Sequence, residues 1–112
     1  MLNEEIDIIA REVVDDVLKI LDKKVYKIVL YGSYARGDFT KESDVDIMII
    51  LDCSKDEVRQ YRRQISRLAS RIGLKNDIEV SLLLRDRQTF EQGLSVLPFY
   101  RNIVDEGVEL YG

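Results

Sequence analysis

The sequence contains no histidine and no tryptophan, and it has one cysteine and one proline among its 112 residues. Without histidine, a Ser-His-Asp triad, a Cys-His dyad and a His-ligated zinc ion are all excluded. The single cysteine, Cys53, cannot form an internal disulfide, so nothing in the cysteine content points to secretion. Any chemistry must therefore come from carboxylates, Lys and Arg side chains, hydroxyls and backbone amides.

Long apolar runs and targeting signals are also missing. The longest uncharged stretch, residues 92–100, is far shorter than the roughly 20 residues that span a bilayer. The N-terminus is acidic and lacks the basic region of a signal peptide. We therefore expect a cytoplasmic protein with no membrane partner, and the length predicts one domain over residues 1–112.

The charges are unevenly distributed. The 21 acidic and 17 basic residues give a net charge of -4, which argues against non-specific nucleic-acid binding. Residues 54–75 nevertheless hold seven Lys or Arg and only two acidic residues. Six of these cations recur every four residues and would form a ridge along a helix: Lys55, Arg59, Arg63, Arg67, Arg71 and Lys75. This basic ridge is either a solvated face or a docking surface for an acidic partner or RNA.

Apolar residues at three- and four-residue spacing predict two long helices. The first covers residues 5–22 and is capped by Asn3. The second begins at Ser54, has a capping box with Glu57 and ends at Gly73. Two shorter helices are predicted over residues 85–93 and 97–105.

Runs of β-branched and apolar residues predict strands over residues 25–31, 45–51 and 78–84, and residues 108–111 are expected to pair briefly with them. The strand at 45–51 is apolar on both faces after Asp46, which is typical of an inner strand. The order of elements predicts an α+β fold with a small mixed sheet and helices packed mainly on one face.

Two carboxylates open the inner strand. Asp44 and Asp46 are two residues apart, so they share a face and lie roughly 6.5 Å apart along an extended chain. The alternate positions are wholly apolar, so the aspartates project away from the packed face. Two such groups can reach one divalent ion, or bracket a pair of ions about 3.5–4 Å apart. Their hard oxygen atoms suit Mg²⁺, with Mn²⁺ as the alternative.

The strand predicted over residues 78–84 repeats this pattern. Glu79 alternates with apolar residues, so it shares a side with Asp44 and Asp46 if the packed faces of the two strands coincide. Three carboxylates on one face would repel each other strongly without a cation. The pattern therefore predicts a metal site. Asp77 has the same parity as Glu79 and remains the alternative third carboxylate.

Gly32 and Ser33 follow the first predicted strand and form a candidate phosphate site. Glycine allows close backbone approach, and N–H groups point outward at the start of a turn. Arg36 can add a charge-assisted contact to a phosphate. Alone, a Gly-Ser pair after a strand could be a simple turn, and an Asp-x-Asp pair could be the solvated end of a strand. The combination, at this spacing, indicates function.

The string from Gly32 to Asp38, followed by Ser43-Asp44-Val45-Asp46, resembles the signature of the nucleotidyltransferase superfamily, which includes DNA polymerase beta. The spacing is similar to that of its minimal branch, in which Gly-Ser is followed by ten residues and Asp-x-Asp. The resemblance covers nearly the whole chain and implies the nucleotidyltransferase fold.

The resemblance also implies roles for individual residues. It implies that Asp44 and Asp46 bind two Mg²⁺ ions and the nucleotide phosphates. Glu79 matches the third carboxylate, which helps activate the attacking hydroxyl. Gly32 and Ser33 match the residues that hold the β- and γ-phosphates. Arg36 matches a further nucleotide-binding position of the motif.

The implied activity is transfer of a nucleoside monophosphate, AMP from ATP, to a hydroxyl. The chain is too short for an added domain that binds a small acceptor, so we expect a protein acceptor. Proteins of the minimal branch that resemble this chain are antitoxins that adenylylate a tyrosine of a HEPN-type RNase toxin. The alternatives are an antitoxin that acts by binding alone and the catalytic subunit of a small-molecule nucleotidyltransferase. The base preference and the presence of a homo-oligomer stay open.

Overall fold

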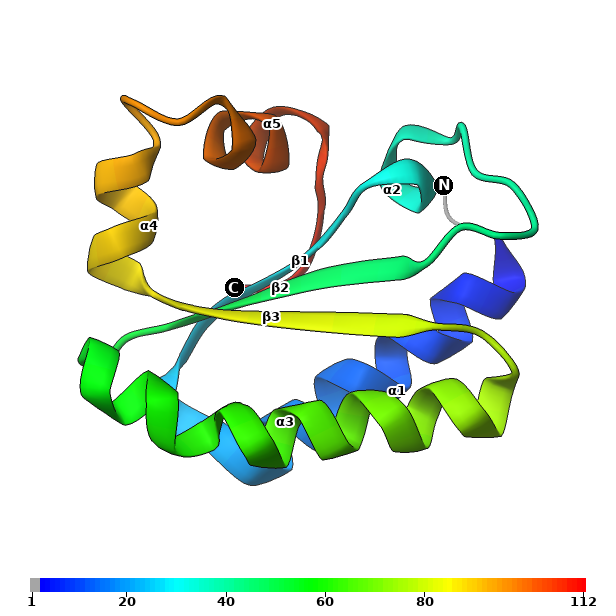
Figure 1. Cartoon of the computed structure of the whole chain (residues 1–112), viewed down its shortest axis with the longest axis horizontal. Helices are drawn as coiled ribbons and strands as arrows, with labels where there is room; N and C mark the ends of the chain where they lie inside the picture. The colour runs from blue at the N-terminus through cyan, green and yellow to red at the C-terminus, as the bar shows by residue number, and fades with distance from the viewer. Residues whose placement is uncertain (1–2) are drawn as a thin grey trace.

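A computed structural model describes residues 3–112 and has a four-stranded mixed sheet at its centre, in the order β3-β2-β1-β4 (Figure 1). The strands are β1 (Val25–Tyr31), β2 (Val45–Leu51), β3 (Val80–Asp86) and β4 (Val108–Tyr111). Strand β1 is antiparallel to β2 and β4, whereas β2 and β3 are parallel. The predicted α+β class is confirmed, and β2 is an inner strand as its two apolar faces indicated.

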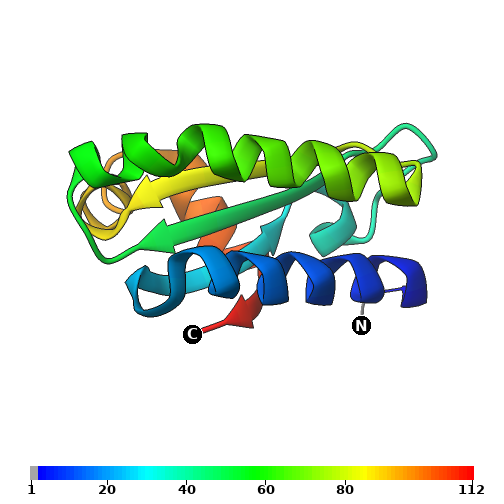
Figure 2. The same cartoon turned by 90° about the horizontal axis from the view of Figure 1, so that it is seen from below.

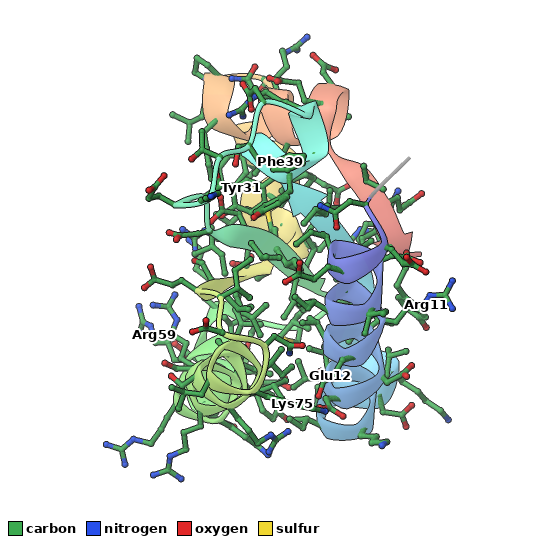
Figure 3. All side chains as sticks on the ribbon, turned by 90° about the vertical axis from the view of Figure 1, so that its right-hand side faces the viewer. Arg11, Glu12, Tyr31, Phe39, Arg59 and Lys75 are labelled. Atoms are coloured by element: carbon green, nitrogen blue, oxygen red, sulfur yellow. The ribbon has the colours of Figure 1, made fainter. Side chains whose placement is uncertain are left out.

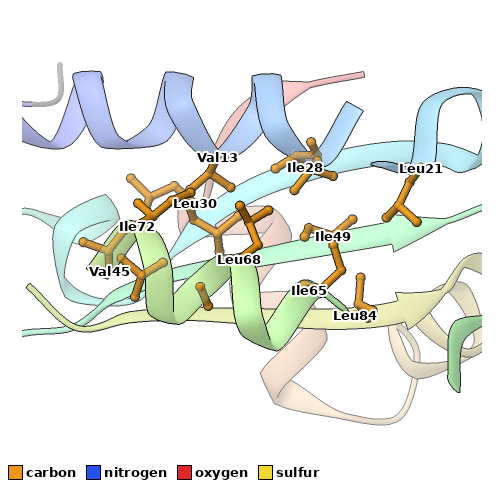
Figure 4. Close-up of a cluster of buried hydrophobic side chains, with 14 of the residues drawn as sticks. Val13, Leu21, Ile28, Leu30, Val45, Ile49, Ile65, Leu68, Ile72 and Leu84 are labelled. Carbon is orange, nitrogen blue, oxygen red and sulfur yellow. The ribbon is translucent and has the colours of Figure 1, made fainter. Parts of the chain in front are cut away.

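Two long helices, α1 (Glu4–Leu21) and α3 (Lys55–Asn76), lie side by side on one face of the sheet (Figure 2). Their apolar stripes and the inner face of β1 and β2 form the main core (Figure 4). Fully buried members of this core include Val13, Ile28, Leu30, Val45, Ile49, Ile65, Leu68 and Ile72. Burial of each such side chain contributes about 1.5–3 kcal/mol to folding, so this face carries most of the stability.

Both long helices begin where the sequence predicted. The Asn3 Oδ1 atom accepts a hydrogen bond from the Ile6 N–H at 2.8 Å, and Ser54 Oγ accepts one from the Glu57 N–H at 3.2 Å. The predicted capping box is only half formed, because the Glu57 carboxylate instead accepts from Lys24 Nζ at 3.1 Å. Each cap satisfies an N–H group that the first helical turn leaves unbonded.

The predicted end of the second helix at Gly73 is wrong. Helix α3 continues to Asn76 and ends at Asp77, which has a left-handed φ of 53° and donates its N–H to the Gly73 carbonyl. A β-carbon at Gly73 would lie 2.7 Å from the Ile78 carbonyl oxygen, so glycine is required there for close packing. Because Ile78 still bonds to the helix end, strand β3 begins at Val80, two residues later than predicted.

The opposite face of the sheet carries two short helices, α4 (Arg87–Gly93) and α5 (Pro98–Glu106), close to their predicted positions. They cover a smaller apolar cluster formed by Val29, Met48, Ile50, Phe90, Tyr100 and Ile103. Between the strands lie a 3-10 turn, η1 (Asp22–Lys24), and a single helical turn, α2 (Ser33–Arg36). Within residues 3–112, no helix is long and apolar enough to cross a membrane.

Candidate active site

The end of β1 and the start of β2 bring Gly32 and Asp46 into contact. Tyr31 pairs with Asp46 across the antiparallel ladder, and Gly32 follows with a φ of 79°. A β-carbon on Gly32 would lie 2.5 Å from the Oδ2 atom of Asp46. Glycine therefore serves two purposes here, because it adopts the positive φ and leaves room for the carboxylate.

Asp44 and Asp46 lie together at the start of β2, on the face opposite α1 and α3. Asp46 is half-buried, and burial raises the pKa of its carboxyl, with a further increase from the nearby charge of Asp44. Arg36 opposes this shift in pKa but does not cancel it. Two carboxylates that repel each other in a partly desolvated position are a donor set that fits a divalent cation.

The turn α2 carries the residues for which the sequence predicts phosphate contacts. The Ala35 and Arg36 N–H groups both donate to the Gly32 carbonyl at 3.1 Å. The N–H groups of Ser33 and Tyr34 are the first two of the turn, so they have no partner within it and remain available to a ligand. These donors and the Ser33 hydroxyl directly follow Gly32, the residue that the Asp46 carboxylate approaches.

Arg36 is held by carboxylates in this structure. Its Nε atom lies 3.2 Å from an Asp38 oxygen and 3.8 Å from Glu106 Oε2. The Glu106 contact was not predicted, because only the fold brings the end of α5 next to α2. A phosphate that binds Arg36 would have to compete with these two carboxylates.

Glu79 lies beside Asp44 in register, just before β3. Val45 pairs with Val80, and the Val45 N–H donates to the Glu79 carbonyl at 2.9 Å. Side-chain alternation then gives Glu79 the same parity as Asp44 and Asp46, and its side chain is exposed. The alternative, Asp77, ends helix α3 in a left-handed conformation and does not belong to the strand.

The structure thus brings Gly32, Ser33, Asp44 and Asp46 together and places Glu79 at the border of this group. Among residues 3–112, no three His, Cys, Asp or Glu side chains converge closely enough to form a metal-binding group by themselves. The pair of aspartates is therefore a candidate ligand set for a divalent cation, which would need further oxygen ligands from elsewhere.

The sequence did not single out Tyr31, which is the ladder partner of Asp46. The Tyr31 ring is half-buried and makes an edge-to-face contact with Phe99 of α5, with ring centroids 5.8 Å apart. Burial, and then the charge of Asp46, raises the pKa of the Tyr31 hydroxyl. In the segment that follows β1, the ring of Tyr34 stacks on that of Phe39, with ring centroids 4.6 Å apart. Figure 3 shows Tyr31 and Phe39 on the side of the sheet that carries α2.

The basic ridge lies on α3, on the other face of the sheet from Asp46. Arg71 pairs with Asp16 at 3.3 Å, and Lys75 pairs with Glu12 at 2.9 Å. Figure 3 shows Glu12 and Lys75 facing each other between α1 and α3. The end of the ridge therefore joins the two long helices, and the ridge is not part of the candidate active site.

Comparisons with known proteins agree on one family. The sequence model of the nucleotidyltransferase domain matches residues 10–110. A protein of Methanocaldococcus jannaschii, provisionally named a protein adenylyltransferase, is 35% identical over 88 residues, which is 79% of this chain and 80% of that protein. A second protein with this provisional name from the same organism is 39% identical over 80 residues, which is 71% of this chain and 79% of that protein.

Solved structures share the fold at lower identity. A crystal structure of a toxin–antitoxin with AMP-PNP has a TM-score of 0.61 at 23% identity, and the match covers 92% of this chain and 73% of that chain. A MntA-HpeT toxin–antitoxin variant, with glutamate in place of two aspartates two residues apart, has a TM-score of 0.56 at 21% identity. That match covers 88% of this chain and 70% of the other. These likenesses establish the arrangement of elements.

Proposed function

The chain belongs to the nucleotidyltransferase domain family, and we propose that it is a Mg²⁺-dependent protein adenylyltransferase that transfers AMP from ATP to a hydroxyl. The observation that carries this proposal is the contact between the Asp46 carboxylate and Gly32, beside Asp44 and the first turn of α2. This contact supports the proposal, because our candidate metal ligands and our candidate phosphate donors then lie side by side, as nucleotidyl transfer requires.

Asp44 and Asp46 would hold the metal ions. Two Mg²⁺ ions bound there would neutralise charge on the phosphates and lower the pKa of the acceptor hydroxyl. The N–H groups of Ser33 and Tyr34 would bind the β- and γ-phosphate oxygens, and Arg36 would move from Asp38 to a phosphate. Exposed Glu79, beside Asp44 in register, is our candidate for the third carboxylate.

The reaction is a displacement at phosphorus. The acceptor oxygen forms a bond to the α-phosphorus, the bond from that phosphorus to the β-phosphate oxygen breaks, and pyrophosphate leaves with the electron pair. The hydroxyl proton passes to the Glu79 carboxylate. The other residues of the site act through positioning and electrostatic stabilisation.

We propose a tyrosine of a HEPN-type toxin as the acceptor, so that the protein acts as an antitoxin. Two sequence relatives carry the name protein adenylyltransferase, and toxin–antitoxin crystal structures have the same fold, which supports this proposal. The candidate site is open to solvent on one side, because the side chain of Glu79 and the loop at 38–43 that precedes Asp44 are largely exposed. An open site favours an acceptor that brings its own folded surface.

Label transfer tests this proposal. The purified protein is mixed with Mg²⁺, ATP labelled at the α-phosphate and the protein encoded by the neighbouring gene. We expect label on a tyrosine of that partner, and none when the tyrosine is changed to phenylalanine. The variant D44N/D46N should transfer no label, whereas the matched control D105N, which changes an exposed aspartate of α5, should match the wild type.

Absence of label with the wild type, or equal labelling by D44N/D46N, would contradict the proposal. If D44N/D46N still suppresses the toxin at an equimolar ratio, the protein is an antitoxin that acts by binding. If label appears only on small hydroxyl compounds, the protein is the catalytic subunit of a small-molecule nucleotidyltransferase.

A further inference from the structure

Phe99 is an exposed aromatic residue next to the candidate active site. It lies in the first turn of α5 with 45% of its surface exposed. Its ring meets Tyr31 edge to face at 5.8 Å, and Tyr31 is the ladder partner of Asp46. Figure 1 shows α5 and α2 on the same side of the sheet. Phe99 therefore stands one side chain away from the carboxylate that contacts Gly32.

Phe99 is exposed, whereas the neighbouring aromatic residues Phe90 and Tyr100 are buried in the apolar cluster under α4 and α5. Tyr100 is buried and packs against Phe90, with ring centroids 5.4 Å apart. Its hydroxyl accepts a hydrogen bond from Arg85 Nε at 3.0 Å. Phe99 instead leaves much of its ring in solvent, and its neighbours Val96 and Leu97 are exposed as well. Such an exposed apolar group, beside a polar site, is typical of a surface that a ligand covers.

We propose that Phe99, held in place by Tyr31, is the surface on which the nucleobase of the bound triphosphate stacks. The inference rests on the proposed function, because it takes the phosphates to lie at Ser33 and the metal ions at Asp44 and Asp46. In this arrangement the base extends from the phosphates toward α5, where the exposed ring of Phe99 lies against Tyr31, the ladder partner of Asp46. Nucleobases stack on aromatic rings regardless of their identity.

Two consequences distinguish a stacking residue from a merely structural one. A phenyl ring offers no hydrogen bond to the edge of a base, so Phe99 should favour ATP and GTP equally over a triphosphate without a base. The edge-to-face contact with Tyr31 fixes the ring before the nucleotide arrives, so little side-chain entropy is lost when the base stacks.

Calorimetric binding of Mg²⁺-ATP, Mg²⁺-GTP and Mg²⁺-tripolyphosphate to the full chain tests the inference. We expect F99A to weaken ATP and GTP binding by at least about fivefold and tripolyphosphate binding by less than about twofold. F99L keeps an apolar side chain against Tyr31 but removes the ring, so it should behave like F99A and separates stacking from packing. V104A changes another exposed apolar residue of α5 and should match the wild type.

A fluorescent readout complements the calorimetry. The triphosphate of 2-aminopurine riboside should lose fluorescence when it binds the wild type, because the base stacks, and should lose less when it binds F99L. Thermal unfolding of each variant without nucleotide shows that the chain is folded.

The outcomes separate this inference from the proposed function. If the wild type binds neither ATP nor tripolyphosphate, both are overturned. Only the stacking role is overturned if the wild type binds ATP and both F99A and F99L bind it as tightly. The same holds if these variants lose affinity for ATP and for tripolyphosphate to the same degree. If F99L leaves ATP binding intact but reduces labelling of the partner protein, the ring contacts the acceptor instead, and the inference is again wrong.

Discussion

The Oδ2 atom of Asp46 lies 2.5 Å from the point where a β-carbon would stand on Gly32. Gly32 directly follows β1 and Asp46 lies in β2, and their contact joins the candidate phosphate site to the candidate metal site. Gly32 also has a φ of 79°, a conformation that L side chains rarely adopt. The glycine is therefore constrained both by its own backbone and by the carboxylate opposite.

The first prediction concerns Gly32 itself. G32A should destabilise the protein by at least about 2 kcal/mol, because it combines backbone strain with a clash against Asp46. It should also abolish label transfer, since the carboxylate must move. Urea unfolding and the transfer assay measure the two effects.

G37A is the matched control for this prediction. Gly37 also has a positive φ, 86°, but nothing lies within 4 Å of a β-carbon there. G37A should cost about 1 kcal/mol of stability and keep its activity. Equal loss of transfer in both variants would mean that the contact with Asp46 is not what matters.

The second prediction concerns the aspartate pair and its metal. Without Mg²⁺, D44N/D46N should be at least as stable as the wild type, because it removes a partly buried charge and a repulsion that raise the pKa of Asp46. Adding Mg²⁺ at ten times its dissociation constant should stabilise the wild type by about 1.4 kcal/mol and leave the variant unchanged. Denaturant unfolding with Mg²⁺ and with EDTA gives these values, with D105N as the control. A marked loss of stability in D44N/D46N without metal would contradict the account of this site.

The third prediction concerns Arg36 and its competitors. R36Q should weaken tripolyphosphate binding by about tenfold or more, because a charge-assisted hydrogen bond is lost. E106Q should have the opposite effect. It should strengthen tripolyphosphate binding by up to about fivefold, since it removes a carboxylate 3.8 Å from Arg36 Nε. R62Q, at an exposed position of α3, is the control. Weaker binding by E106Q would show that Glu106 positions Arg36 and does not compete for it.

The fourth prediction concerns the link between α1 and α3. The hydrogen bond from Lys75, followed by that from Asn76, lowers the pKa of Glu12 against the opposing effect of burial. A carboxyl whose pKa is lower in the folded state stabilises the protein above its ordinary pKa, about 4.3, and loses that contribution as the pH falls through the folded pKa. E12Q should therefore cost up to about 1 kcal/mol at pH 7 and little at pH 3. Urea unfolding at both values measures this, with exposed Asp15 changed to asparagine as the control. A loss that is the same at both pH values would rule out the charge of Glu12 as its source.

Much of the architecture could be predicted from local patterns. The strand at residues 45–51 and the starts of both long helices followed from apolar spacing and from the caps Asn3 and Ser54. Gly73 misled the prediction, because the same residue type that ends helices also allows close packing inside one. What decides between these roles here is the close approach of the Ile78 backbone carbonyl to Gly73, and this depends on how the chain turns after α3.

The sequence by itself determined which chemistry the protein has available and which face carries it. Without histidine, the available groups were carboxylates, Lys and Arg side chains, hydroxyls and backbone amides, and side-chain alternation along an apolar strand put Asp44 and Asp46 on one side of the sheet. Only the tertiary structure decided the distances, because they depend on strand register and on helix packing. It set Asp46 against Gly32, held Arg36 with Glu106 and brought Phe99 to Tyr31, joining segments that no local pattern connects.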